Sequence, residues 1–218
     1  MSEDLERIYS TRFQERHRAS KERIWPPIVE HLRRYMVDGP IVDIGCDLGY
    51  FIRNVRAEER WATDVRDVSA ELPPDVHFVQ ADGLALTDAL PLDYFGIAFM
   101  SNYLEHLPSR DAVVDQFGVI RKILRPGGRV IVLQPNVRLI GGRYWDFIDH
   151  SVPMTEASLE EAATVAGLRT HRMVTRFLPY TTKSRLPQHP VLVRAYLAFP
   201  PAWWLFGKQT LYVGERPP

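Results

Sequence analysis

The chain alternates short apolar runs with longer amphipathic segments. The runs do not alternate strictly between apolar and polar positions, which is typical of strands buried on both faces of a parallel sheet. Turn-forming residues bound five of them, at residues 41–45, 61–64, 76–80, 95–100 and 129–134. Two later strands are predicted at residues 172–177 and 209–214.

Helical periodicity occupies intervals between these strands. Residues from about 3 to 37 are charge-rich, with Ile28 and Leu32 among apolar residues at helical spacing. Further helices are predicted after the first strand through about residue 60, over 110–124, and over 155–166 with a capping-box pattern. Because strands alternate with helices, we expect an α/β fold: a Rossmann-like, mostly parallel sheet with helices on both faces.

Length and composition indicate a single domain, and the charged residues are distributed unevenly along it. The 218 residues are 45% hydrophobic and 25% charged, which is typical of one globular domain spanning 1–218. Within it we expect an N-terminal helical cover at 1–38 and an insertion at 178–208, before the last strand. The net charge of zero combines 19 basic and 26 acidic side chains in residues 1–161 with eight basic and one acidic in residues 162–218.

Few features indicate a compartment. The single cysteine, Cys46, excludes an intrachain disulfide and agrees with a reducing cytosol. The first 30 residues show no secretory signal. The longest apolar stretch is broken by Arg194 and by two prolines, so it is a poor spanning helix. These features predict a cytoplasmic protein.

Acidic and glycine residues follow the first three predicted strands. In such sheets ligands bind at the carboxyl ends of the strands, where a carboxylate can accept ribose hydroxyls and an acidic side chain can accept an adenine amine. The candidate residues are Asp43, Gly45, Cys46, Asp47 and Gly49 at the end of the first strand and just beyond it, Asp64 and Val65 at the end of the second, and Asp82 and Gly83 after the third. Together they predict adenosine binding, whereas the glycine turn alone is equally consistent with a plain strand-to-helix connection.

The sign of the charge in the first turn distinguishes two cofactors. A dinucleotide needs a turn that holds a pyrophosphate, and the carboxylate of Asp47 would repel it. S-adenosylmethionine has no phosphate and carries an ammonium and a sulfonium, so an acidic turn suits it. The charge therefore favours S-adenosylmethionine.

Several stretches together resemble class I S-adenosylmethionine-dependent methyltransferases. They cover most of the chain in the family's order: Val42-Asp43-Ile44-Gly45-Cys46, Asp64, Ala81-Asp82-Gly83, Asn102-Tyr103-Leu104-Glu105-His106-Leu107 and Leu124-Arg125-Pro126-Gly127-Gly128. The resemblance implies a seven-stranded sheet whose last strand, 209–214, is reversed. Two residues depart from the family: Asp47 replaces a usual glycine, and Gly96 a usual aspartate. We expect Asp47 to receive the cofactor's ammonium.

A closer resemblance is to a bacterial subgroup found with glycosyltransferase and polysaccharide genes. Its matching stretches include Leu133-Gln134-Pro135-Asn136, Tyr144-Trp145-Asp146-Phe147-Ile148-Asp149-His150 and Arg176-Phe177-Leu178-Pro179-Tyr180. We also expect Tyr9, Arg12 and Asn102 to contact the cofactor. Tyr144, Asp149, Lys183 and Arg185 are the predicted substrate-binding residues.

Two histidines are candidate bases for methyl transfer to a hydroxyl. His106 follows the fourth strand and His150 the fifth, where Asp149 or Asp146 could orient the imidazole. The alternative for His106 is structural, tying a helix start to the sheet. Metal ligands do not cluster in the sequence, so no metal is expected.

The sequence favours an O-methyltransferase acting on a saccharide or a glycosylated small molecule, with or without phosphate. The alternatives are an N- or C-methyltransferase on a natural product, and a non-catalytic cofactor-binding partner subunit in a glycan-assembly complex. The 178–208 insertion is expected to be an acceptor wall, a membrane-surface contact or a homodimer interface. Nucleic acid is not expected as a partner, because the Asn-Pro-Pro-aromatic signature is absent after the fourth strand.

Overall fold

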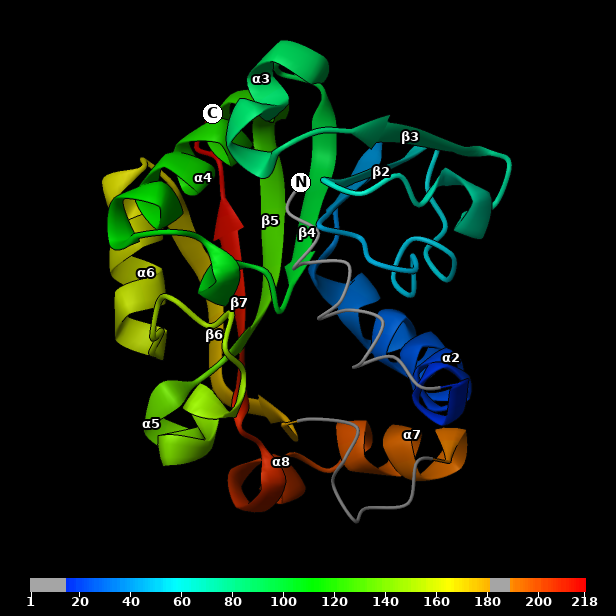
Figure 1. Ribbon diagram of the computed structural model, residues 1–218, viewed down its shortest axis with the longest axis vertical. Coiled ribbons are helices and arrows are strands. Elements are labelled where there is room, and N and C mark those ends of the chain that lie inside the picture. Colours follow the sequence, from blue (N-terminus) through cyan, green and yellow to red (C-terminus); the bar gives the residue numbers. More distant parts are fainter. Residues whose placement is uncertain (1–14, 181–188) are drawn as a thin grey trace.

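A seven-stranded sheet organises the protein in the computed structural model, which describes residues 15–180 and 189–218 (Figure 1). Its strand order is β3-β2-β1-β4-β5-β7-β6, and only β7 runs antiparallel to its neighbours. The strands are β1 (Ile41–Ile44), β2 (Arg60–Asp64), β3 (Val76–Gln80), β4 (Phe95–Ser101), β5 (Leu124–Pro135), β6 (Arg169–Leu178) and β7 (Gln209–Glu215). The predicted Rossmann-like sheet with a reversed last strand is therefore confirmed.

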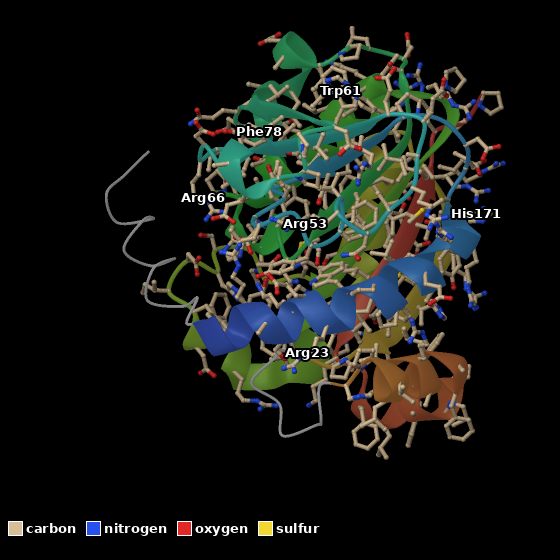
Figure 2. The ribbon with its side chains drawn as sticks, turned by 90° about the vertical axis from the view of Figure 1, so that its right-hand side faces the viewer. Arg23, Arg53, Trp61, Arg66, Phe78 and His171 are labelled. Carbon is tan, nitrogen blue, oxygen red and sulfur yellow. The ribbon has the colours of Figure 1, made fainter. Side chains whose placement is uncertain are left out.

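Helices cover both faces of this sheet. The α-helices are α2 (Glu15–Leu32), α3 (Leu86–Ala89), α4 (Arg110–Ile123), α5 (Val137–Ile140), α6 (Glu156–Val165), α7 (Pro190–Ala198) and α8 (Pro200–Phe206). Short 3-10 helices are η1 (Arg33–Tyr35), η2 (Ser69–Glu71), η3 (Gly83–Ala85), η4 (Leu104–His106) and η5 (Gly141–Asp146). Helices α4 and α6 pack on one face, whereas α2 packs on the other beside α7 (Figures 1 and 2).

Two apolar layers follow from this arrangement. Phe117 and Ile120 of α4 pack against the face that carries Val130, and Leu32 of α2 packs against the face that carries Phe99. All four residues of β1 are buried, which is usual for a central strand of a parallel sheet and here includes the carboxyl group of Asp43. The capping box of α6 is also confirmed, with Thr155 as its N-cap.

The helix expected between β1 and about residue 60 is wrong, because the chain forms successive turns there. Asp47 and Gly49 both have positive φ, at 50° and 71°. Tyr50, Phe51 and Ile52 are all buried, and three consecutive residues cannot share one face of a helix. The core therefore takes these side chains from a turn instead.

The described part of the insertion contains α7 and α8, which the sequence analysis did not predict. Both begin with proline in their first turn, where its missing N–H and fixed φ are tolerated. Prolines that looked like helix breakers are thus helix starts. None of the helices in residues 15–180 and 189–218 is long and apolar enough to cross a bilayer.

Gly96 has a steric explanation. A Cβ there would lie 3.1 Å from the carbonyl carbon of Asp38 and would clash with its oxygen. The backbone before β1 crosses the start of β4 at this point, and the Gly96 N–H donates to Pro40 O at 2.9 Å. An aspartate would not fit this crossing.

Candidate functional site

A cavity of about 800 Å³ lies at the carboxyl ends of β1 to β4. Its volume is that of a pocket for a cofactor-sized ligand. One end is formed by the residues that follow β1, β2 and β3, and it continues past β4 to side chains from η4, α7 and α8. The cavity therefore has a polar half at the strand ends and an apolar half beneath the late helices.

The turn after β1 is shaped by a tyrosine ring. Gly45 has φ +65°, and a Cβ on it would lie 3.2 Å from Cε2 of Tyr103. Its neighbour Cys46 is buried, and this burial raises the pKa of the thiol, which the nearby Asp43 and Asp64 reinforce. Glycine thus lets the backbone pass beneath Tyr103 at the edge of the cavity.

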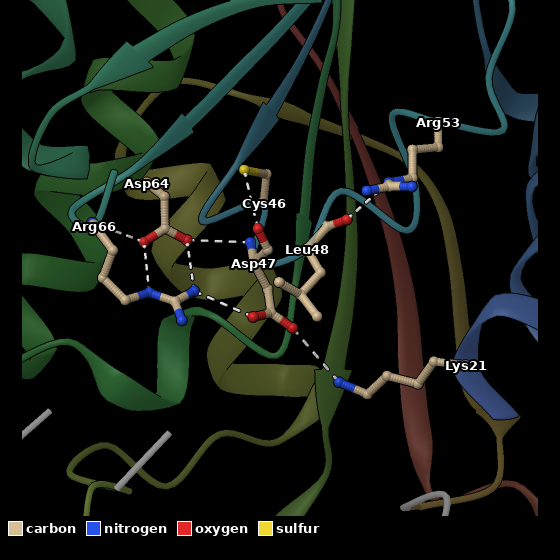
Figure 3. Close-up of polar contacts among 7 residues, drawn as sticks. All are labelled: Lys21, Cys46, Asp47, Leu48, Arg53, Asp64 and Arg66. Carbon is tan, nitrogen blue, oxygen red and sulfur yellow. Dashed lines mark hydrogen bonds and ion pairs between the residues drawn. The ribbon is translucent and has the colours of Figure 1, made fainter. Parts of the chain in front are cut away.

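An ion-pair network surrounds the candidate cofactor carboxylates (Figure 3). Arg66 donates to both oxygens of Asp64, from Nε to Oδ1 at 3.0 Å and from Nη2 to Oδ2 at 3.1 Å. The same Nη2 lies 3.1 Å from Oδ1 of Asp47, whose Oδ2 lies 3.6 Å from Nζ of Lys21. The Asp47 N–H completes the network by donating to Asp64 Oδ2 at 3.1 Å.

This network changes the charge argument for the first turn. Asp47 was predicted to offer its negative charge to a cationic ligand, but two cationic side chains, Lys21 and Arg66, already contact it. Lys21 comes from α2, whereas Asp47 lies in the turn after β1 (Figure 3). Burial lowers the pKa of Lys21, although Asp47 opposes that shift. A ligand ammonium at Asp47 would have to replace the Lys21 contact.

The other predicted cofactor residues lie along the same strand ends. Asp43 is buried, and this raises its pKa to about 8. Asp82 caps η3 by accepting the Leu84 N–H at 2.9 Å, Asn102 is exposed with φ 50°, and Val65 is 44% exposed. All four line the cavity. Gly49 is buried but does not line it.

A cluster of imidazole and carboxylate groups lies past the end of β4. The rings of His106 and His150 are 5.0 Å apart. His106 Nδ1 lies 3.1 Å from the backbone oxygen of Asp149 and 3.3 Å from its Oδ2. Glu105 is buried beside them, and both histidines line the cavity with it. The structure therefore brings together the two candidate bases and Asp149, although Asp149 contacts His106 and not His150, the imidazole it was predicted to orient.

Tyr144 requires a correction. Its side chain is fully buried, its hydroxyl donates to Val152 O at 2.5 Å, and it does not line the cavity. Its ring instead packs against His150, with centroids 4.8 Å apart. Tyr144, which was predicted to bind substrate, thus packs against His150 and helps to hold its ring in place.

Four predicted residues lie outside the described residues: Tyr9, Arg12, Lys183 and Arg185. Conversely, Lys21, Arg66, Tyr103 and Glu105 line the site but were not among the residues predicted from the sequence. Glu105 also groups with His106 and His150, so the fold brings together three side chains of metal-ligand type that are not clustered in the sequence. Only Glu105 carried a signal, its position beside His106 in the sequence.

These residues fit S-adenosylmethionine. Carboxylates at three neighbouring strand ends offer acceptors for hydroxyl and amine groups and negative charge for cations. The Tyr103 ring packs so closely on Gly45 that a side chain larger than hydrogen would not fit at this turn. The fold and the site define a class I S-adenosylmethionine-dependent methyltransferase.

Comparisons with known proteins agree with this class. Residues 9–172 match the methyltransferase domain family, and the chain belongs to that family. No curated protein matches the sequence.

Several solved structures share the fold. An S-adenosylmethionine-dependent methyltransferase from Archaeoglobus fulgidus is 17% identical, with 95% of this chain and 99% of that chain covered and a TM-score of 0.65. A Thermotoga maritima protein described as a possible histamine N-methyltransferase is 14% identical, with 93% of each chain covered and a TM-score of 0.69. Geranyl diphosphate C-methyltransferase from Streptomyces coelicolor is 15% identical, with 87% of this chain and 76% of that chain covered and a TM-score of 0.61.

Proposed function

We propose that the protein transfers a methyl group from S-adenosylmethionine to a hydroxyl oxygen of a saccharide or glycosylated small molecule. The observation that carries this proposal is the contact of His106 with Asp149 beside His150, on a cavity that also reaches the cofactor turns. An imidazole held by a carboxylate next to an acceptor site is suited to take a hydroxyl proton.

S-adenosylmethionine supplies a methyl group that is already activated on a sulfonium, which takes the electron pair of the breaking carbon–sulfur bond. The protein therefore has to bind and orient two ligands, and this positioning accounts for much of the rate. Asp64 and Asp82 hold the adenosine end. His106 or His150 receives the acceptor's proton while the new oxygen–carbon bond forms.

The apolar half of the cavity indicates what kind of acceptor would fit. Leu178, Leu192 and Tyr196 line it together with Phe206, so an acceptor with an apolar group beside its sugar fits better than a bare sugar. An anionic group on the acceptor, such as phosphate, rests on the excess of basic residues in 162–218 alone, because none of those that the structure describes lines the cavity. N- or C-methylation and a non-catalytic subunit are the competing functions.

A screen of candidate acceptors with isotope-labelled cofactor, read by mass spectrometry, tests the reaction. We expect His106→Gln or His150→Gln to abolish transfer while calorimetry shows unchanged cofactor affinity. His77→Gln is the matched control, because it removes an exposed imidazole from β3. Full activity in both histidine variants would show that neither histidine acts as the base, so that positioning of the two ligands alone would account for the rate. Cofactor binding without transfer to any acceptor would favour the non-catalytic subunit.

We also propose that Asp47 receives the ammonium of the cofactor in exchange for Lys21. The 3.6 Å contact between Lys21 and Asp47 is the observation that supports such an exchange. Asp47→Ala should weaken cofactor binding, whereas Lys21→Met should strengthen it by removing the competitor. Unchanged affinity in Asp47→Ala would eliminate this role.

The remaining expectations for the 178–208 insertion stay predictions. Its described part exposes Phe199, Trp204 and Leu205, a surface that suits a membrane contact or a second subunit. Flotation with anionic vesicles tests the first and light scattering tests the second. The cytoplasmic location and the association with glycan genes are likewise proposals.

A further inference from the structure

Three side chains of metal-ligand type converge on the lining of the cavity past the end of β4. One nitrogen from His106, one from His150 and one carboxylate oxygen from Glu105 all lie within 4.8 Å of one another. Glu105 and His106 belong to η4, and His150 follows η5, so the ligands come from two separate segments. All three residues line the cavity, which leaves one side of the group open to a small molecule.

Glu105 is the residue that most needs an explanation. It is 1% exposed, and its Oε2 atom has no hydrogen-bond partner in the described structure. Leaving a buried carboxylate oxygen without a hydrogen-bond partner is costly, and native proteins avoid it unless a charge or an ion compensates. A cation among the three side chains would supply that compensation.

The two imidazoles are held in orientations that suit such an ion. Asp149 contacts Nδ1 of His106, so that Nε2 faces the cluster, 4.0 Å from Glu105 Oε1. A carboxylate on the second nitrogen is the usual partner of a metal-binding histidine. The ring of His150 stacks on Phe147, with centroids 5.0 Å apart, and Tyr144 packs on it from another side.

We propose that Glu105, His106 and His150 bind a divalent first-row transition metal ion, with Asp149 orienting His106. Two imidazoles and one carboxylate suit Mn²⁺, Fe²⁺, Co²⁺ or Zn²⁺ better than Mg²⁺ or Ca²⁺, which prefer all-oxygen sites. Ligand atoms at bond lengths of about 2.1 Å stand roughly 3.4 Å apart around a tetrahedral ion. Modest side-chain rotations would close the site to this spacing.

The role of the ion rests on the proposed function. An ion with its open side toward the cavity would bind the acceptor hydroxyl and lower its pKa. The hydroxyl proton would pass to solvent, and the histidines would act as ligands instead of bases. This role makes methyl transfer dependent on metal, whereas a free imidazole base does not.

Cobalt titration tests the site without any acceptor. Protein made without a polyhistidine tag is dialysed against EDTA and titrated with Co²⁺, with visible absorption and equilibrium dialysis as the readouts. We expect one tightly bound ion per chain, and affinity lower by about 10- to 100-fold in Asp149→Asn. His150→Gln and Glu105→Gln should weaken binding at least as much, and His77→Gln should not change it. Near-UV circular dichroism verifies that each variant is folded, and His150→Gln suffices should the buried Glu105 variant fail to fold.

The outcomes separate the two proposals. EDTA-treated protein that binds no Co²⁺, or binding that His77→Gln weakens as much as His150→Gln, overturns the metal site. Equal methyl transfer by metal-free and cobalt-loaded protein overturns the role of the ion. Cobalt-loaded protein that binds cofactor but methylates no acceptor contradicts the proposed function and leaves the site standing.

Discussion

Replacing Gly83 with alanine tests whether Tyr103 is positioned as the structure shows. Gly83 is buried at the start of η3. A Cβ on it would lie 2.7 Å from Gln116 Oε1 and 2.9 Å from Cζ of Tyr103, with the tyrosine oxygen nearer still. The Tyr103 hydroxyl donates to Gln116 Oε1 at 2.8 Å. Alanine therefore has to displace the ring and break this hydrogen bond.

The expected cost has three parts. Overpacking a close-packed site costs about 1–3 kcal/mol, and leaving a buried polar group without its partner costs about 1–3 kcal/mol. Gln116 is 0% exposed, so water cannot replace the tyrosine hydroxyl. Alanine recovers about 0.4–1 kcal/mol by restricting the unfolded chain. We expect the free energy of unfolding to fall by roughly 2–4 kcal/mol, since the two losses share one displaced ring.

Urea unfolding followed by tryptophan fluorescence measures this change. Gly118→Ala is the matched control, because Gly118 lies inside α4 and a Cβ there meets no atom within 4 Å. That variant should be more stable by up to about 1 kcal/mol. Cofactor affinity should fall only in Gly83→Ala, since Tyr103 also covers Gly45 in the cavity. If Gly83→Ala is as stable as Gly118→Ala, the placement of Tyr103 is refuted.

Three further predictions concern charge. Asp64→Asn should weaken cofactor binding by about 10- to 100-fold in calorimetry, because a hydrogen bond to a charged group is worth about 1.5–3 kcal/mol; unchanged affinity would contradict its role. Burial raises the pKa of Asp43 to about 8, so binding a cationic cofactor should release a proton and strengthen as pH rises toward 8. Calorimetry in buffers of different ionisation enthalpy measures this release, which Asp43→Asn should abolish. Burial lowers the pKa of His31 to about 4, with Arg34 contributing. The unfolded state then binds more protons between pH 4 and 6.5, so stability is complete above pH 6.5 and falls by roughly 3 kcal/mol toward pH 4. In His31→Phe this pH dependence of urea unfolding should flatten, and an unaltered slope would contradict the assignment.

Site residues that lie at the carboxyl ends of strands could be predicted from the sequence. Asp64 and Asp82 were found because parallel strands end at one edge of a sheet, so chain position alone groups them. Lys21 could not be found this way, because its contact with Asp47 requires α2 to lie across the cavity. No local pattern encodes where a helix outside the sheet will pack.

Errors in the prediction have local causes. The turns after β1 were predicted as a helix because this segment is hydrophobic. The sequence does not show that Tyr50, Phe51 and Ile52 are all buried, which a helix would not allow. Glu105 was passed over because charged residues beside a helix start are usually exposed. Its burial results from packing around η4, which the sequence does not show.

The position of β7 has a consequence for how the chain is made. β7 lies between β5 and β6 in the sheet, although it is the last strand along the chain. During synthesis β6 and the outer edge of β5 therefore leave the ribosome without their neighbour, and both expose unpaired backbone groups until Gln209–Glu215 emerges. A ribosome that stalls within α8 would hold a chain whose sheet is split in two. The protein thus depends on its last described strand for protection from aggregation while it is being made.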